Sequence, residues 1–325
     1  MSVVHGIVLL DKPLGLSSSQ ALTRAKKLLR ADKAGHTGSL DPLATGMLPC
    51  CFGEATKIAG LLLGSHKAYH AEVALGATTA TGDREGEVLR ARCVPALDAA
   101  RIDAVLAQFR GRIRQVPPAY SAIKIDGVRL YKLARRGEAV EAPEREVHIQ
   151  RLDWLPQASR IGSAAWTPAV ALSDIEGKPP AAAGADFPIL AIDVVCGSGT
   201  YIRSLAADIG QALQCGAHLA SLRRSWVDPF EGQVMYTLEQ LQSLEQAGGL
   251  QAALLPVAAG LRDWRRVDLD ADGERRLRCG QIVPLPMNAA LGECRVHGPD
   301  GHLLALARVE AGGTLRSTRV FGPGV

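Results

Sequence analysis

Residues 35–45 read GHTGSLDPLAT, a stretch in which small and polar residues surround one aspartate, Asp41, that is followed by a proline. Glycine, serine and Asp-Pro pairs favour turns over regular helix or strand, so the stretch predicts a polar loop. Local chemistry by itself favours a plain turn. The alternative is a loop that presents the Asp41 carboxylate for chemistry, and the rest of the chain decides between the two.

Length and composition are those of an ordinary folded protein. The chain has 325 residues, 47% of them hydrophobic and 22% charged, which predicts about two domains with a sizeable core. The formal net charge of +4 is too small to indicate a nucleic-acid partner by itself. The seven cysteines include no C-x-x-C pair, which argues against a zinc ribbon or a redox motif and predicts reduced thiols in the cytoplasm.

No segment has the features of a membrane or secretion signal. The N-terminal apolar run lacks a preceding basic segment, so it is interpreted as a buried strand rather than a signal peptide. No run approaches the roughly 20 apolar residues that a membrane helix needs.

Hydrophobic periodicity predicts a mixture of helices and strands. Ser17 and Gln20 have capping-box spacing at the start of the first helix. Strands are expected at residues 4–15, 67–76 and 189–196, and helices at 21–31, 53–64, 97–111, 128–137 and 237–249. Residues 197–216 predict a glycine turn that leads into a further helix. Residues 155–187 are rich in Ala, Gly, Ser and Pro and predict a surface insertion, and the chain from Trp264 onward predicts a small β-rich module.

Arg203 is the second candidate for chemistry. Thr200 is expected to cap the helix that follows it, which places Arg203 in the first turn, where a cation opposes the helix dipole. A buried carboxylate partner would explain that position, and the arginine would then hold the pKa of Asp41 low. The alternative is a surface arginine with its head in water.

Two tyrosines are further candidates. Tyr69 shares a predicted strand face with Ala71, Val73 and Leu75, so its ring is expected to point inward. A core tyrosine whose hydroxyl finds a hydrogen bond is the ordinary alternative for Tyr69 and for Tyr201.

Two basic clusters suit either a solvated helix face or an RNA phosphate backbone. Their members are Arg24, Lys26, Lys27, Arg30 and Lys33, and then Lys124, Arg129, Lys132, Arg135 and Arg136, with Tyr131 inside the second cluster. Phosphate-loop and zinc-protease motifs are absent from the sequence. A glycosidase-type hydrolase needs two carboxylates placed across the bond, whereas the polar loop offers a single carboxylate.

Several motifs occur in an order that resembles the bacterial TruB family of tRNA pseudouridine synthases, which modify the T-loop uridine. They are KP-x-G-x-S-S at 12–18, GHTGSLDPLATGMLP at 35–49, GEATK at 53–57, K-x-Y at 67–69, GTYIRSLAADIG at 199–210 and GAHLASLRR at 216–224. The resemblance covers most of residues 5–230. It implies an α+β pseudouridine synthase fold with a mixed, mostly antiparallel central sheet flanked by helices, formed by residues 1–250. Residues 251–325 resemble the family's RNA-binding PUA-like domain more weakly.

The resemblance also implies roles for residues at the reaction centre. Asp41 matches the catalytic aspartate, Arg203 the arginine paired with it, and Lys57 a supporting basic residue near the site. Family members often carry a lysine where this chain has Ser198, which puts one phosphate contact in doubt but leaves the catalytic set intact.

Other matched positions imply contacts to the substrate. Tyr69 matches the tyrosine that stacks on the target base, and Tyr201 and Leu222 match residues of the uridine pocket. His36 matches a histidine that contacts RNA as the uridine flips out. Residues 117–145 match a region that closes on the T-stem.

Isomerising uridine to pseudouridine consumes no group and moves no electron, so no cofactor or metal is expected. One ionised aspartate is enough to start it, by attack on the sugar C1′ or the uracil C6 or through a glycal-like intermediate. The expected partner is the T-stem-loop of tRNA, with no membrane and no obligate protein partner, and the expected state is a cytoplasmic monomer. A non-catalytic RNA-binding protein and a hydrolase using Asp41 remain as alternatives.

Overall fold

The computed structural model describes residues 4–121, 123–125, 127–130, 133, 136, 142–162, 164–165 and 187–322. The chain forms two compact units. The first unit consists of Met1–Pro42, Gly46–Ser65 and Val227–Val325, and the second of Leu43–Thr45 and His66–Trp226. Eight strands form the main sheet, and the pairings β1–β3, β2–β3, β4–β11, β10–β11 and β7–β10 are all antiparallel. The expected α+β architecture is confirmed.

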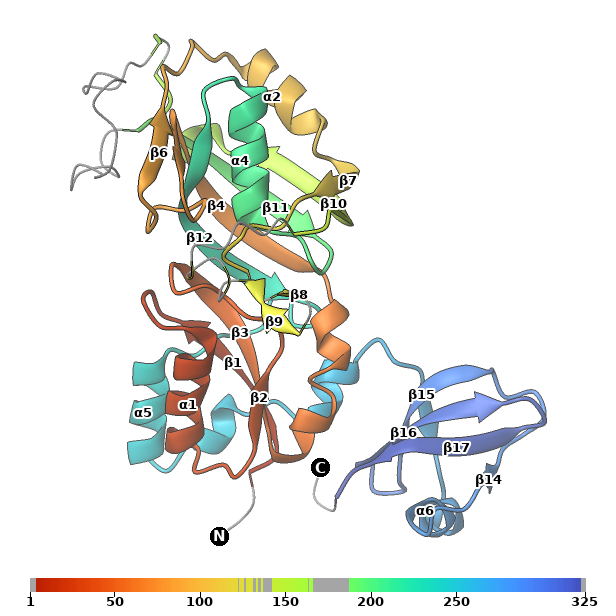
Figure 1. The fold of residues 1–325 in the computed structure, drawn as a ribbon. Coiled ribbons are helices and arrows are strands. Elements are labelled where there is room, and N and C mark those ends of the chain that lie inside the picture. The colour runs from red at the N-terminus through yellow and green to blue at the C-terminus, as the bar shows by residue number, and fades with distance from the viewer. Residues whose placement is uncertain are drawn as a thin grey trace. The chain divides into compact units, whose positions relative to one another are not determined.

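The first unit is built on strands β1 (Gly6–Lys12) and β3 (Ala44–Phe52), which pair from Gly6 opposite Phe52 to Lys12 opposite Gly46. The short strand β2 (Ala34–His36) also pairs with β3. Helices α1 (Ser18–Leu28) and α5 (Leu238–Gln246) pack against each other beside these strands (Figure 1).

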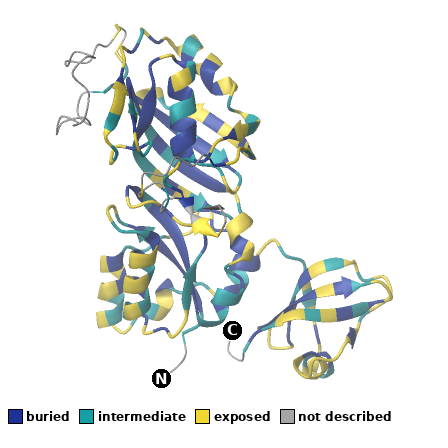
Figure 2. Ribbon diagram, viewed as in Figure 1, coloured by how far each residue is buried: buried dark blue, intermediate teal, exposed yellow. Residues whose placement is uncertain are grey.

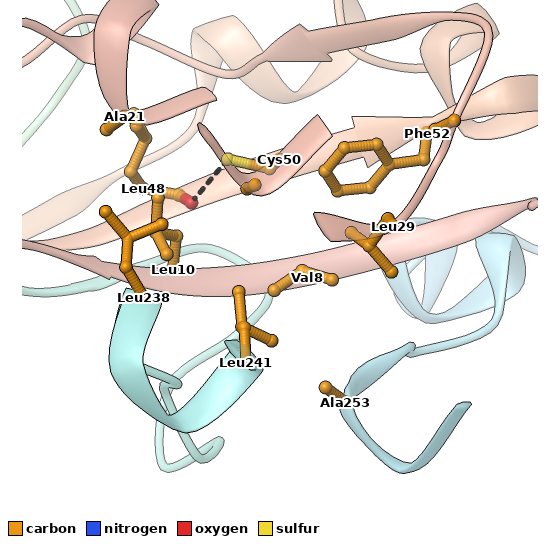
Figure 3. Packing of buried hydrophobic residues seen from close by; sticks show 12 residues of the cluster. Val8, Leu10, Ala21, Leu29, Leu48, Cys50, Phe52, Leu238, Leu241 and Ala253 are labelled. Carbon is orange, nitrogen blue, oxygen red and sulfur yellow. Dashed lines mark hydrogen bonds between the residues drawn. The ribbon is translucent and has the colours of Figure 1, made fainter. Parts of the chain in front are cut away.

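Apolar side chains from these strands and helices meet in one core, drawn in Figure 3. Its labelled members are Val8, Leu10, Ala21, Leu29, Leu48, Cys50, Phe52, Leu238, Leu241 and Ala253. Burying this surface is the main stabilising contribution, at roughly 25 cal/mol per Å² of apolar area.

The second unit has the strand order β12-β4-β11-β10-β7. The strands are β12 (Ala217–Val227), β4 (Lys67–Leu75), β11 (Ile189–Cys196), β10 (Arg145–Trp154) and β7 (Gly111–Gln115). Helix α4 (Ile202–Ala212) contacts β4, and helix α2 (Ala99–Ala107) contacts β10 and α4. A hairpin of β5 (Ala77–Thr79) and β6 (Val88–Ala91) completes this unit together with β8 (Lys124–Ile125), β9 (Val128–Arg129) and η3 (Pro156–Ala158). Figure 2 shows the buried residues concentrated in the sheet strands and in α4.

A second, smaller sheet lies in the C-terminal module, defined here as residues 264–322. Its order is β13-β15-β16-β17-β14. The strands are β13 (Arg266–Asp268), β14 (Val283–Pro284), β15 (Gly292–His297), β16 (Leu303–Glu310) and β17 (Thr314–Val320), and helix α6 (Ala271–Arg278) packs on β14 and β17. A β-rich C-terminal module is therefore confirmed, whereas a domain boundary at residue 250 stays a prediction.

Most predicted elements are confirmed. Ser17 and Gln20 form the capping box of α1, and a second one at Thr237 and Gln240 begins α5. The predicted helix at 53–64 is wrong, because the structure has two short 3-10 helices there, η1 (Gly53–Lys57) and η2 (Leu61–Gly64). Glycines at 53, 60 and 64 weaken a continuous α-helix in this window.

Other predictions need correction or fall outside the described residues. Two short 3-10 helices, η5 (Leu250–Ala253) and η6 (Val257–Leu261), lie between α5 and the C-terminal module and were not predicted. Helix α6 was not predicted, because Leu277 is its only large buried apolar side chain. Half of the predicted helix 128–137 and most of the predicted insertion 155–187 lie outside the described residues. The first two residues of that predicted helix form strand β9 instead.

Two observations bear on the expected class of protein. All seven cysteines are free thiols, as expected. Among the described residues, no helix combines the length and apolarity needed to cross a membrane.

Candidate active site

The Asp41 loop begins directly after β2 and presents an exposed aspartate. The residue before it is fixed by Ser18, the first residue of α1, whose side chain is buried. The Leu40 amide donates to Ser18 Oγ at 2.7 Å, and this hydroxyl donates back to the Leu40 carbonyl at 3.0 Å. The start of α1 therefore positions the backbone immediately ahead of Asp41.

The residue after Asp41 is approached by Lys12, whose side chain is fully buried at the end of β1. Its Nζ donates to the carbonyls of Leu16 at 2.6 Å and Pro13 at 2.9 Å. It also lies 3.5 Å from the Pro42 carbonyl. A buried ammonium needs such acceptors, and they tie the segment at 12–18 to the loop that carries Asp41.

His36 lies in β2 opposite Cys50 of β3 and is half-buried. The next amide, that of Thr37, donates to the Pro49 carbonyl at 3.1 Å. The strand pairing thus fixes the backbone of the predicted RNA-contacting histidine five residues before Asp41.

Arg203 lies at the start of α4 in the second unit, but the expected cap is wrong. The N-cap is Tyr201, and Ile202 is the first helical residue. Thr200 instead uses its hydroxyl to donate to the Gly197 carbonyl at 3.0 Å, which closes the preceding turn. Arg203 is therefore the second helical residue, still in the first turn.

The Arg203 guanidinium is buried, with 6% of the residue exposed, which excludes the surface alternative. It donates to the carbonyls of Thr81 at 2.9 Å and Tyr120 at 2.8 Å. Its Nη1 also lies 3.8 Å from Oδ2 of Asp83, a buried carboxylate. Buried charge is tolerated when it is paired and hydrogen-bonded, and Arg203 meets both conditions.

Asp83 is a functional candidate that the sequence analysis missed. Its Oδ1 accepts from the Thr81 hydroxyl at 2.5 Å and from the Glu85 amide at 3.1 Å, which leaves Oδ2 directed at Arg203. Residues 82–86 read GDREG, and this sequence by itself predicts only a turn. The available signal was an aspartate enclosed by turn glycines, the same setting that marks Asp41.

Tyr201 is held from β7 by a two-way contact with Gln115, a buried side chain. The Tyr201 amide donates to Gln115 Oε1 at 3.1 Å, and Gln115 Nε2 donates to the Tyr201 carbonyl at 3.3 Å. The Arg145 guanidinium carbon lies 6.0 Å from the centre of the Tyr201 ring, within the range of a cation–π contact. Strand β7 and Arg145 therefore orient the residue that begins α4.

The two remaining predicted pocket residues also lie in the second unit. Tyr69 is buried in β4, as predicted, and is paired with Val194 of β11. Leu222 is half-buried in β12, and its carbonyl lies 3.5 Å from the Thr45 hydroxyl. The predicted set is thus divided: Asp41 and His36 belong to the first unit, and Tyr69, Tyr201, Arg203 and Leu222 belong to the second.

Lys57 has contacts with the C-terminal module. Its Nζ donates to Glu54 at 2.6 Å and to the Val320 carbonyl at 2.9 Å, and it lies 5.7 Å from the centre of the Phe321 ring. Burial acts to raise the pKa of Glu54, but hydrogen bonds from Lys57 and the Gly322 amide outweigh it and hold that pKa below its usual value. A supporting role for Lys57 in catalysis stays a prediction.

The first basic cluster is on the surface, as either of its interpretations requires. Arg24, Lys27, Arg30 and Lys33 are exposed, and Arg30 forms an ion pair with Glu245 at 3.0 Å. In the second cluster, Tyr131, Lys132 and Arg135 lie outside the described residues, as does much of the segment 117–145. Within the described ranges, no group of three or more His, Cys, Asp or Glu side chains is arranged to hold a metal ion.

Comparison with known proteins agrees with this fold. Two solved structures align with 98% of the chain: an H/ACA RNP bound to a substrate RNA containing 2′-deoxyuridine (TM-score 0.68, 22% identity, 86% of that chain) and a Cbf5-Nop10-Gar1 complex (TM-score 0.67, 24% identity, 85% of that chain). At this level of identity they show a shared fold.

Sequence comparison defines the class. Residues 26–173 match the N-terminal domain of TruB family pseudouridylate synthases, and residues 203–262 match the C-terminal domain of tRNA pseudouridylate synthase B. Fold and family models together define a pseudouridylate synthase. A tRNA pseudouridine synthase B from Xanthomonas axonopodis pv. citri (strain 306) is 52% identical over 98% of this chain and 94% of its own length. One from Xylella fastidiosa (strain Temecula1 / ATCC 700964) is 47% identical over 98% of this chain and 96% of its own length. The chain belongs to the TruB family.

Proposed function

We propose that the protein isomerises uridine to pseudouridine in tRNA, that its target is the T-loop uridine, and that Asp41 is the nucleophile. The observation that carries this proposal is the Asp41 loop itself. The exposed carboxylate stands between two neighbours whose backbones are tied to Ser18 and Lys12. Such a loop presents one carboxylate in a reproducible position, which a nucleophile requires.

The reaction breaks the bond from uracil N1 to ribose C1′ and forms one from C5 to C1′. The proton on C5 is released and N1 gains one, so atoms and charge balance without a cofactor. Attack on C1′, attack on C6 and a glycal route all begin with an ionised aspartate. Arg203 is proposed to support the reaction centre, and Asp83 to orient Arg203.

The remaining residues are proposed to hold the extruded nucleotide. Taking a base out of a folded loop costs a few kcal/mol, and stacking on the Tyr69 ring would return about 1–3 kcal/mol. Tyr201 and Leu222 are proposed to line the uridine pocket, and His36 to contact the RNA as the base leaves its stack. The exposed cations of α1 suit phosphate contacts, which supply affinity that falls with salt.

Other expectations follow from the same proposal. The protein is expected to act without a cofactor and as a monomer. Its seven free thiols suit the reducing cytoplasm.

The test is release of tritium from tRNA labelled at C5 of uridine. Wild-type protein should release tritium, and Asp41→Asn should bind tRNA as well as wild type while releasing none. Asp32→Asn, which changes another exposed aspartate of the same unit, is the matched control and should remain active. Appreciable turnover by Asp41→Asn would refute the nucleophile, and tRNA binding by an inactive wild-type protein would favour the RNA-binding alternative.

A further inference from the structure

The β5–β6 hairpin and its turn approach one face of α4 at two places. Arg203, Ala207 and Gln211 are spaced by four residues, so they share a face of this helix. The turn of the hairpin meets the start of this helix face, where the Thr81 carbonyl accepts a hydrogen bond from Arg203. The open end of the hairpin meets the other end of the same helix face, where Gln211 lies.

A pocket of about 520 Å³ occupies this far end. Arg90 and Arg92 line it from the hairpin together with Leu89, and Ala207, Gln211 and Cys215 line it from α4 and the segment that follows. Eight residues of helix separate Arg203 from Gln211, which corresponds to about 12 Å along the axis. The pocket is therefore distinct from the contacts around Arg203 but lies on the same helix face.

The pocket is positively charged. None of its lining residues is acidic. Arg90 and Arg92 are exposed, and neither forms an ion pair with any residue that the structure describes. The carbonyl end of α4 is met by a different residue, Arg101, whose Nη2 lies 3.5 Å from the Leu213 carbonyl.

The Cys215 thiol, which lines the pocket, also lies in the field of nearby arginines. Burial raises the pKa of Cys215, while the charges of Arg101 and Arg92 act in the opposite direction. The pocket thus combines a largely apolar lining with two arginines that form no ion pair within the described part of the chain. That combination fits a sugar–phosphate backbone, whose phosphates would meet the arginines and whose sugars would meet the apolar surface.

We propose that this pocket is a second anchor for the substrate RNA, which binds the sugar–phosphate backbone outside the reacting nucleotide through Arg90 and Arg92. The proposal rests on the proposed function for the identity of the RNA. Two phosphate contacts of this kind release bound counterions, so they make a defined contribution to the salt dependence of binding.

The test is the affinity of the full-length chain for tRNA, measured as a function of salt concentration. The double variant Arg90→Gln/Arg92→Gln should bind tRNA more weakly at low salt. The slope of log K against log salt should become shallower by about 1.4 to 1.8, the value for two lost phosphate contacts. An unchanged slope would overturn the proposal.

The matched control is Arg151→Gln/Arg160→Gln. It removes two exposed arginines of the same unit that already form ion pairs, with Asp153 at 3.2 Å and Glu72 at 3.4 Å. Its slope should equal that of wild type, and an equal change in both double variants would overturn a specific anchor. Because binding is the readout, absence of tritium release by wild type would refute the proposed function without deciding this test.

Discussion

At the scale of single residues, the buried contacts of Arg203 explain why an arginine occupies the first turn of a helix. A cation there opposes the helix dipole. Two backbone carbonyls and the Asp83 carboxylate offset that cost, because each is directed at the guanidinium. The arginine is thus held by the tertiary structure against the preference of its own helix.

Replacing Asp83 should show this dependence. Asp83→Asn removes a buried carboxylate that lies beside the Arg203 guanidinium, so the free energy of unfolding should fall by up to about 3 kcal/mol and turnover should fall with it. Urea unfolding and tritium release measure the two effects. Glu85→Gln, which changes an exposed acid two residues further on, should leave both unchanged. Full turnover by Asp83→Asn would contradict the orienting role.

His297 predicts a pH dependence in the C-terminal module. Burial lowers the pKa of this ring, and its Nδ1 donates to the Gly301 carbonyl at 2.9 Å. Nε2 is buried and has no hydrogen-bond partner among the described residues. Because the folded pKa lies below the unfolded one, the unfolded chain takes up the proton first as the pH falls. Stability should therefore be complete above about pH 6.5 and decrease below it.

Hydrogen exchange of the β15 and β16 amides measures this effect directly. Wild type should exchange faster as the pH falls below about 6.5, after correction for the intrinsic pH dependence of exchange. His297→Gln should lose the extra dependence, and His302→Gln, at an exposed histidine, should keep it. If the pH dependence of exchange persists in His297→Gln, a group other than His297 causes it.

At the scale of elements, α1 has a second task besides packing in the core of the first unit. Its first residue, Ser18, exchanges two hydrogen bonds with the backbone of Leu40. The capping box at Ser17 fixes where the helix starts, and this start determines where the Ser18 hydroxyl lies. The helix terminus and the Asp41 loop are therefore one structural feature.

Ser18→Ala tests this coupling. The change leaves the Leu40 amide and carbonyl without their partner, which should cost about 1–3 kcal/mol of unfolding free energy and lower the rate of tritium release. Ser19→Ala is the matched control, because Ser19 is exposed and only its carbonyl is used, by the Thr23 hydroxyl. Equal effects of the two substitutions would refute the coupling.

At the scale of the whole molecule, the C-terminal module contacts η1 of the first unit through a small set of polar groups. Lys57 contacts the end of β17 and the Phe321 ring, and Glu54 accepts from the Gly322 amide at 2.5 Å. Arg319 donates to the Lys57 carbonyl. These contacts make Lys57 part of the joint between the module and η1.

Glu54→Gln should weaken this joint, because an amide is a poorer acceptor than the carboxylate that Lys57 and Gly322 now share. The Gly322 amide should exchange faster with solvent. The neighbouring Phe321 amide is an internal control, since it bonds to the Leu304 carbonyl inside the module at 2.8 Å and should be unaffected. In wild type the joint should persist above the ordinary glutamate pKa of about 4.3 and be lost as the pH falls through the lower folded pKa. Unchanged exchange at Gly322 would exclude Glu54 from the joint.

The sequence by itself determined the local features of this protein. The capping box of α1, the strand at 189–196, the inward face of Tyr69 and the polar loop around Asp41 all follow from contacts within a few residues. Periodicity and caps are local properties, so one chain segment is enough to read them. Family resemblance then supplied the roles that these residues are proposed to have.

Only the tertiary structure decided which distant residues meet. Asp83 lies 120 positions from Arg203, and Lys12 lies 30 positions from Pro42, so no local pattern could pair them. The same holds for the placement of Lys57 against Phe321 and for the two arginines that line the pocket beside α4. Partners of this kind are chosen by the need to satisfy buried polar groups and charges, and that need arises only once the chain has folded.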